Sequence, residues 1–140
     1  MNRLERVLQV EDSSEDRMMT AEALSEASPS TELRSVATAK DAITMISARG
    51  EWRPDVVLLD LSLPGEAGFA VLQFIKGQPD LQSIPVIFFS SSKAPLDVNK
   101  AYQLQANCYI PKPADFDGYV ALMALLIKFC VSCVELPSPC

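Results

Sequence analysis

Histidine is absent from the 140 residues of this chain. Its absence removes the most common general base, the usual activator of a nucleophile and the commonest metal ligand. Any chemistry must therefore rest on carboxylates, hydroxyls, a lysine or a thiol. An excess of positive charge is also lacking, since 18 acidic and 12 basic residues give a formal net charge of −6. An acidic surface repels phosphate backbones, so we expect no binding to nucleic acid.

The sequence has no internal repeat, no low-complexity segment and no recognisable signal peptide. The N-terminus, Met1 to Arg6, is polar and runs straight into a short apolar stretch, so secretion is not expected. We therefore expect a cytoplasmic protein with reduced cysteines. Cys130 and Cys133 form a C-x₂-C pair, but no histidine or second pair of ligands accompanies them, so a zinc site is not expected.

What is present fits one domain. Hydrophobic residues make up 49% of the chain and charged residues 21%, which is enough for a core and argues against disorder. We expect this domain to span residues 1–136 and residues 137–140 to form a short flexible tail.

Short apolar runs alternate with longer amphipathic stretches, which is typical of strand–helix units around a parallel sheet. Val56–Leu59 and Val86–Phe89 are apolar throughout, which favours strands buried on both faces. Five such units predict an α/β fold with a doubly wound parallel sheet. The predicted strands are residues 6–10, 31–36, 56–59, 86–89 and 108–110, and the predicted helices are residues 14–27, 39–49, 68–76, 95–104 and 115–134.

The residues suited to chemistry all follow predicted strands. Glu11 and Asp12 end the first strand, Asp60 the third and Ser90 the fourth, and Lys112 follows the fifth. One such residue alone would more often be a helix cap or a loop residue. Five of them at the carboxyl ends of parallel strands instead favour a site, because open α/β sheets bind ligands there.

Three converging carboxylates raise one another's pKa unless a cation lies among them. Mg²⁺ prefers oxygen ligands, so carboxylates and a backbone carbonyl suit it. The carboxylate of Asp60 could then attack a phosphoryl donor, while the metal and Lys112 neutralise charge on the transferred oxygens. The hydroxyl of Ser90 could donate a hydrogen bond to a phosphoryl oxygen.

Four segments, in this order and spacing, resemble the receiver domain of two-component response regulators over nearly the whole chain. They are Val10-Glu11-Asp12, the run from Asp55 to Gly65, the run from Pro85 to Ser91, and Tyr109-Ile110-Pro111-Lys112-Pro113. The resemblance implies a flavodoxin-like (βα)5 domain with strand order 2-1-3-4-5, as in chemotaxis receivers.

The resemblance also implies a role for each matching residue, and a Lys112–Pro113 bond that is often cis. Asp60 would be the phosphoacceptor of a phosphoprotein, Ser90 the switch hydroxyl and Tyr109 the switch aromatic. Lys112 would contact the phosphoryl group. The implied Mg²⁺ ligands are Glu11, Asp12, Asp60 and the backbone carbonyl of Ser62.

Two segments depart from the usual pattern of the family. Ala67 stands before Gly68 where an acidic residue is common, at a position outside the metal site. Gln105-Ala106-Asn107-Cys108 replaces a glycine-containing turn. That segment, together with Asn107-Cys108-Tyr109-Ile110, the long last helix and the Leu136-Pro137 ending, is similar to the subgroup of small regulators paired with bacterial phytochrome histidine kinases.

The predicted last helix is apolar almost all round from Tyr119 to Val134. It is too short to span a membrane, which takes about 20 apolar residues, and Lys128 interrupts it. A surface helix normally has a polar face, so we predict a homodimer through this helix. The expected contacts are Leu122, Leu126, Phe129 and Val134. The alternative is a mostly internal helix with an unused apolar flank.

The leading functional hypothesis is a single-domain response regulator that accepts a phosphoryl group from a partner histidine kinase. It would act by changed protein contacts, and its only enzymatic activity would be its own phosphorylation and dephosphorylation. One alternative is a receiver-like interaction module that needs no phosphorylation, although no residue of the site set is missing. The other is a phosphohydrolase of the haloacid dehalogenase type, which requires a second aspartate where Ser62 stands.

Overall fold

The computed structural model describes residues 4–47, 52–133 and 135–137. Five parallel strands form one sheet in the order β2-β1-β3-β4-β5, which confirms the predicted topology. The strands are β1 (Arg6–Val10), β2 (Glu32–Val36), β3 (Val56–Leu59), β4 (Val86–Ser90) and β5 (Cys108–Pro111). Each matches its predicted range to within one residue. The division into residues 1–136 and 137–140 stays a prediction.

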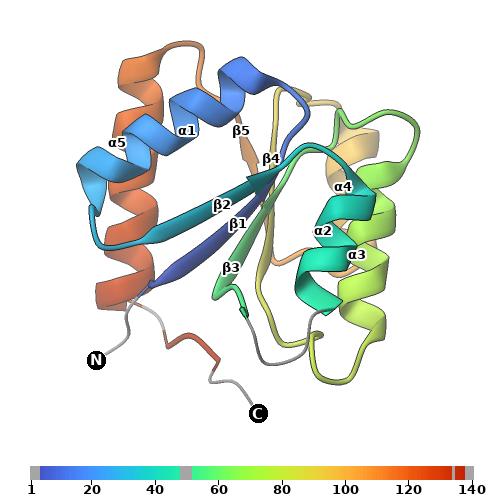
Figure 1. Cartoon of the computed structure of the whole chain (residues 1–140). Helices are drawn as coiled ribbons and strands as arrows, with labels where there is room; N and C mark the ends of the chain where they lie inside the picture. Colours follow the sequence, from blue (N-terminus) through green and yellow to red (C-terminus); the bar gives the residue numbers. More distant parts are fainter. Residues whose placement is uncertain (1–3, 48–51, 134, 138–140) are drawn as a thin grey trace.

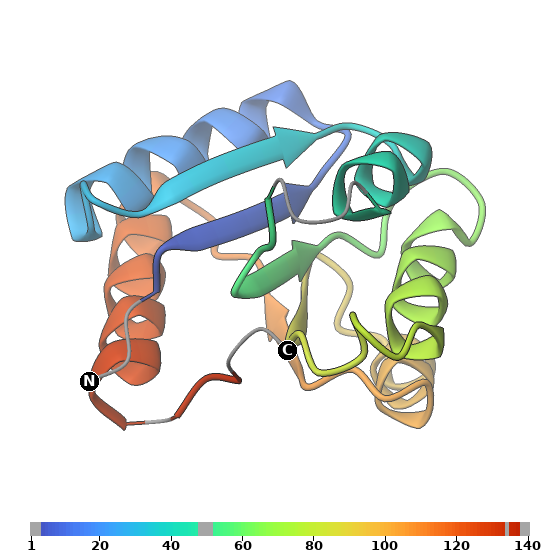
Figure 2. The same ribbon diagram turned by 60° about the horizontal axis from the view of Figure 1, so that its bottom comes forward.

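The helices cover both faces of the sheet (Figures 1 and 2). They are α1 (Ser14–Ala27), α2 (Ala39–Ser47), α3 (Ala67–Gly77), α4 (Pro95–Gln103) and α5 (Phe116–Lys128). One buried cluster joins α2, α3 and α4 to the sheet, and a second joins α1 and α5 to the opposite face. The predicted end of the second helix at Arg49 and Gly50 lies outside the described residues.

Strand register brings the predicted site residues to one edge. Val10 pairs with Leu59, and Leu59 pairs with Phe88. Residues that follow these strands therefore leave the sheet at the same level. Ser90 pairs with Pro111, so Lys112 emerges beside the end of β4. These four loops meet at the carboxyl edge of the sheet, which is why the register decides where the site lies.

Helix caps explain two of the observed boundaries. The Ser13 side chain accepts a hydrogen bond from the backbone N–H of Asp16 (3.2 Å) at the start of α1. At the start of α5, the Asp115 side chain accepts one from the backbone N–H of Gly118 (2.8 Å). Each cap satisfies an N–H group that has no partner within its helix.

The last helix differs from its prediction in two ways. Its α-helical winding ends at Lys128, and Phe129–Cys133 form a π-helical segment. Every residue type in Phe129–Cys133 has low intrinsic helix propensity, which apolar periodicity does not register. Leu126 is wrong as a dimer contact, because it is 7% exposed and packs in the core of its own chain. Val134 lies outside the described residues.

An exposed apolar strip nonetheless runs along α5 into the start of the π-helical segment. Leu125 is 65% exposed and Phe129 is 55% exposed, while Leu122 is half-buried. Among the described residues, no helix is both long and apolar enough to cross a membrane.

The turn after α4 shows what replaces the usual glycine. Gln105 has a φ of 75°, in the left-handed region that glycine adopts without strain. Its N–H donates to the carbonyl of Tyr102 (3.0 Å), and that of Ala106 donates to the carbonyl of Ala101 (3.0 Å). These two bonds make a Schellman motif with glutamine in place of glycine.

The described residues contain no cis peptide bond, so the implied cis Lys112–Pro113 bond is wrong. Trans is the intrinsically favoured isomer even before proline.

Replacing Gln105 by glycine should therefore stabilise the protein. We expect Gln105→Gly to raise the free energy of unfolding by about 0.5–1 kcal/mol. The reason is that the backbone strain of a residue with a Cβ atom in the left-handed region exceeds the conformational entropy that glycine loses on folding. Urea unfolding followed by circular dichroism measures the change. The matched control is Gln73→Gly on the exposed side of α3, which should lower stability by about 1 kcal/mol. A loss of stability in Gln105→Gly would contradict the backbone strain that we assign to Gln105.

Candidate functional site

Three carboxylates meet at the carboxyl edge of the sheet. Glu11, Asp12 and Asp60 each offer one oxygen, and these oxygens lie within 4.8 Å of one another. Glu11 and Asp60 are both 2% exposed, whereas Asp12 is exposed. The oxygen-only donor set fits a hard divalent cation. A divalent ion here would also offset the repulsion among three neighbouring negative groups.

Lys112 is the positively charged side chain that contacts these carboxylates. Its ammonium group donates to Oε1 of Glu11, to Oδ2 of Asp16 (2.7 Å) and to Oδ2 of Asp60 (3.4 Å). The Lys112 side chain is only 6% exposed. A buried cation is stable only when paired, and here it is shared among carboxylates from three separate segments of the chain.

The environment shifts the ionisation of two of these groups. Burial, helped by the neighbouring Asp60 carboxylate, raises the pKa of Glu11 to about 7, although the Lys112 ammonium opposes the shift. Burial alone would lower the pKa of Lys112, but the hydrogen bonds to Asp16 and Glu11 outweigh it and hold that pKa above its usual range. Lys112 therefore remains charged, while the proton on Glu11 competes with any cation for the carboxylate.

Backbone contacts hold the Asp60 side chain in place. The N–H of Asp60 donates to the carbonyl of Val10 (3.0 Å), and Oδ1 of Asp60 accepts from the N–H of Ser62 (3.1 Å). A Cβ atom on Gly68 would lie 2.7 Å from the Asp60 carbonyl oxygen. Glycine is therefore needed for α3 to begin so close to this aspartate. The predicted metal contact of the Ser62 carbonyl stays a prediction.

Ser90 and Tyr109 both contact one residue of the loop between β4 and α4. The hydroxyl of Ser90, which is fully buried, accepts from the N–H of Ser92 (3.3 Å). The hydroxyl of Tyr109 donates to the carbonyl of Ser92 (2.9 Å), and its ring stacks on Phe88 with centroids 5.9 Å apart. Ser92 in turn donates to Oδ2 of Asp97 in α4 (2.6 Å). A movement of Ser90 would thus reach Tyr109 and α4 through one loop.

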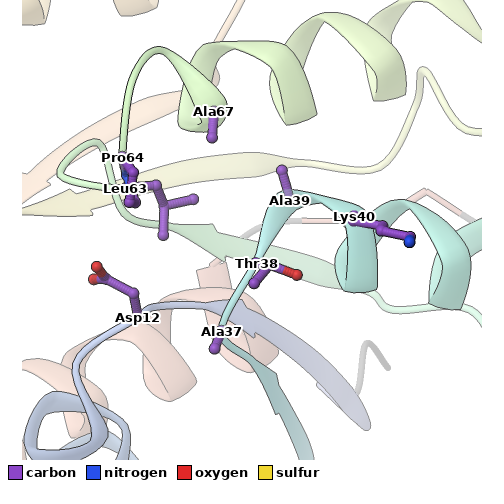
Figure 3. A pocket seen from close by; sticks show the side chains of 8 residues that line it. All are labelled: Asp12, Ala37, Thr38, Ala39, Lys40, Leu63, Pro64 and Ala67. Atoms are coloured by element: carbon purple, nitrogen blue, oxygen red, sulfur yellow. The ribbon is translucent and has the colours of Figure 1, made fainter.

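An apolar cavity of about 460 Å³ opens beside the acidic group (Figure 3). In this view Asp12 lies on one side of it and Leu63 and Pro64 on another. Ala37, Thr38, Ala39, Lys40 and Ala67 complete its lining. Ala67 thus contributes to this cavity from the first turn of α3. Of the three carboxylates, Asp12 is the one that lines this cavity, and it is also the exposed one.

The structure brings Glu11, Asp12, Asp60 and Lys112 together as predicted, and it adds two residues of α1 that the sequence did not indicate. Asp16 pairs with Lys112, and Nη1 of Arg17 donates to the carbonyl of Glu11 (2.8 Å). Asp16 lies in the first turn of a helix, where an acidic residue ordinarily interacts with the helix dipole. Nothing in the sequence distinguishes it from its neighbour Glu15.

Comparison with known sequences agrees with this geometry. The family model for the response regulator receiver domain matches residues 7–124. The response regulator Rcp1 of Synechocystis sp. is 33% identical over 136 residues, which cover 94% of this chain and 92% of the relative.

Two solved structures are similar over almost their whole length. The phosphorylated cyanobacterial phytochrome response regulator RcpA superposes with a TM-score of 0.87 at 34% identity, covering 96% of this chain and 99% of that one. The Mn²⁺-bound form of Rcp1 superposes with a TM-score of 0.84 at 33% identity, with the same coverage of both chains.

The raised pKa of Glu11 predicts how stability depends on pH without metal. Between the ordinary value of 4.5 and about 7, the folded protein holds a proton that the unfolded chain releases. The contribution of Glu11 to the free energy of unfolding should therefore be fully present below pH 4.5 and be lost as the pH rises through about 7. Urea unfolding in the presence of a chelator at several pH values measures this slope.

The variant Glu11→Gln should remove that slope, because glutamine does not titrate. Glu22→Gln, on the exposed side of α1, is the matched control and should keep it. An unchanged slope in Glu11→Gln would contradict the assignment of the shifted pKa to Glu11.

Proposed function

The chain belongs to the response regulator receiver domain family, and on this premise we propose that Asp60 accepts a phosphoryl group from the phosphohistidine of a partner histidine kinase. Receiver domains are signalling proteins that work with histidine kinases, and phosphorylation of an aspartate is their mechanism. The observation that carries the assignment is the buried Asp60 carboxylate, held beside Lys112 and two further carboxylates. No other described group of residues combines an acceptor oxygen with this arrangement of charge.

In the proposed reaction, an oxygen of the Asp60 carboxylate forms a bond to phosphorus. The bond between phosphorus and the imidazole nitrogen of the donor breaks, its electron pair stays on that nitrogen, and the imidazole takes up a proton from solvent. Lys112 neutralises charge on a phosphoryl oxygen, which is the main contribution that a protein makes to this type of transfer. Water later attacks the acyl phosphate, which regenerates the carboxylate and releases inorganic phosphate.

We assign the divalent ion as Mg²⁺, held by Glu11, Asp12, Asp60 and the backbone carbonyl of Ser62. The all-oxygen donor set and the exposure of Asp12, which leaves room for water ligands, support this choice. The Mn²⁺-bound form of Rcp1, at 33% identity, shows that a relative takes a divalent ion. When bound, Mg²⁺ supplies positive charge beside the transferred phosphoryl group.

Ser90 and Tyr109 act as the readout in this proposal. The Ser90 hydroxyl turns to donate to a phosphoryl oxygen and gives up its bond with the N–H of Ser92. Because Tyr109 is bonded to the carbonyl of the same residue, the loop and α4 then rearrange. A changed surface at α4 and β5 would alter which proteins bind, and this is how a local charge change is passed on.

The partner is proposed to be a phytochrome histidine kinase. The support is the identity of about one third with the phytochrome response regulator RcpA and with Rcp1 over nearly the whole chain. The cytoplasmic location expected from the sequence stays a prediction.

Phosphorylation by a small donor tests the assignment. With Mg²⁺ and acetyl phosphate, we expect the intact mass to increase by one phosphoryl group. Asp60→Asn should abolish the adduct, because the amide lacks the nucleophilic oxygen. Asp117→Asn, an exposed aspartate of α5, should keep it. No adduct on the native protein with metal present would favour an interaction module that needs no phosphorylation, and rapid turnover of varied phosphoesters would favour a hydrolase.

We further propose that α5 forms a homodimer interface. Leu125 and Phe129 are one helical turn apart and more than half exposed, and Leu122 continues the same side of the helix. An apolar strip of this kind is costly to leave in water and suits a second copy of the same surface.

Charged substitutions on that strip test the dimer. We expect the double variant Leu125→Glu and Phe129→Glu to be monomeric at concentrations where the native protein is dimeric, because two glutamates would meet their copies across a two-fold axis. Light scattering coupled to gel filtration measures the mass. Met18→Glu, which replaces an exposed residue on α1, should remain dimeric. A native protein that is monomeric with and without phosphorylation would exclude the interface.

A further inference from the structure

We propose that Asp16 is a positioning residue, which holds the Lys112 ammonium toward α1 and so weakens its attraction for a phosphoryl group on Asp60. This inference rests on the proposed phosphorylation of Asp60 and assigns a control on the same site. It concerns how strongly the phosphorylated state is favoured, and not whether it forms.

The position of the ammonium group is the first observation. Lys112 Nζ lies 2.7 Å from Oδ2 of Asp16 but 3.4 Å from Oδ2 of Asp60. The lysine that is expected to serve the phosphoacceptor is therefore bonded more closely to the first turn of α1. An ammonium group has three protons to donate, and Asp16 occupies one of them.

The second observation is that Asp16 differs from the other partners of Lys112. Glu11 and Asp60 belong to the group that can hold a divalent ion, whereas Asp16 does not. A bound ion would be held by Glu11 and Asp60 and would share these carboxylates with the ammonium. Asp16 would keep its ion pair with Lys112, so its hold persists under the conditions in which phosphoryl transfer takes place.

Asp16 is also fixed in place by its own helix. Its N–H donates to the capping Ser13 side chain (3.2 Å). Farther along α1, Thr20 accepts a hydrogen bond from the buried side-chain amide of Gln9 in β1 (3.0 Å). The carboxylate is thus carried on a helix turn whose backbone is capped, in a helix that is anchored to the strand beneath it.

The expected consequence is a competition. A carboxylate and a phosphoryl oxygen are both strong acceptors for an ammonium group, and a negative group close to a bound anion repels it. Removing the charge of Asp16 should free Lys112 for the phosphoryl group and lower this repulsion. The phosphorylated state should then be favoured more strongly than in the native protein.

The test uses beryllium fluoride, a stable mimic of a phosphoryl group on aspartate, in the presence of Mg²⁺. We expect Asp16→Asn to bind it about threefold to tenfold more tightly than the native protein, the range of a partly exposed charged pair. Fluorine NMR of the bound species gives the apparent Kd. Asp16→Ala should shift the affinity in the same direction, so a folding defect in one variant does not decide the result.

The matched control is Glu15→Gln, which removes the same charge from the neighbouring, exposed position of the same helix turn. We expect this variant to bind as the native protein does. An equal gain in affinity in Glu15→Gln would mean a general effect of charge and would overturn the positioning role. Unchanged or weaker binding by both Asp16 variants would also overturn it. Failure of the native protein to bind at all would instead refute the proposed function on which this inference rests.

Discussion

The buried ammonium group of Lys112 is the interaction on which the rest of the site depends. It is shared among Glu11, Asp16 and Asp60, which come from three different segments of the chain. Without a cation, these carboxylates would not remain ionised together in a water-poor site. Lys112 therefore keeps negative charge at the edge of the sheet for a divalent cation, and it also supplies positive charge for a phosphoryl group.

The fold supplies the geometry that this balance requires. Strand register places the ends of β1, β3, β4 and β5 at one level, and Gly68 lets α3 begin against the Asp60 backbone. The same arrangement joins Ser90 and Tyr109 through Ser92, so the chemical site and its readout share one loop. Helix α5 packs with α1 on the face of the sheet opposite to α2, α3 and α4. Its exposed apolar strip is therefore a surface separate from the loop that joins Ser90 and Tyr109.

The sequence predicts which side chains meet at the edge of the sheet, because these residues are tied to strand ends. Glu11, Asp12, Asp60 and Lys112 meet as expected, since buried apolar strands are easy to recognise and their order fixes where they end. Asp16 was not predicted because every acidic residue in a first helix turn looks alike in sequence. The π-helical segment after Lys128 was missed because apolar periodicity does not register helix propensity, and the core position of Leu126 was missed for another reason. A helix that is apolar almost all round gives no polar face to show which side is buried.

The most direct test of the account is chemical location of the phosphoryl group. Borohydride reduces an acyl phosphate on aspartate to homoserine, which peptide mass spectrometry can assign to one position. After transfer from a phosphorylated histidine kinase in the presence of Mg²⁺, the account predicts homoserine at position 60 and at no other aspartate. Homoserine elsewhere in the chain, or none despite transfer from the kinase, would contradict the central claim that Asp60 is the phosphoacceptor.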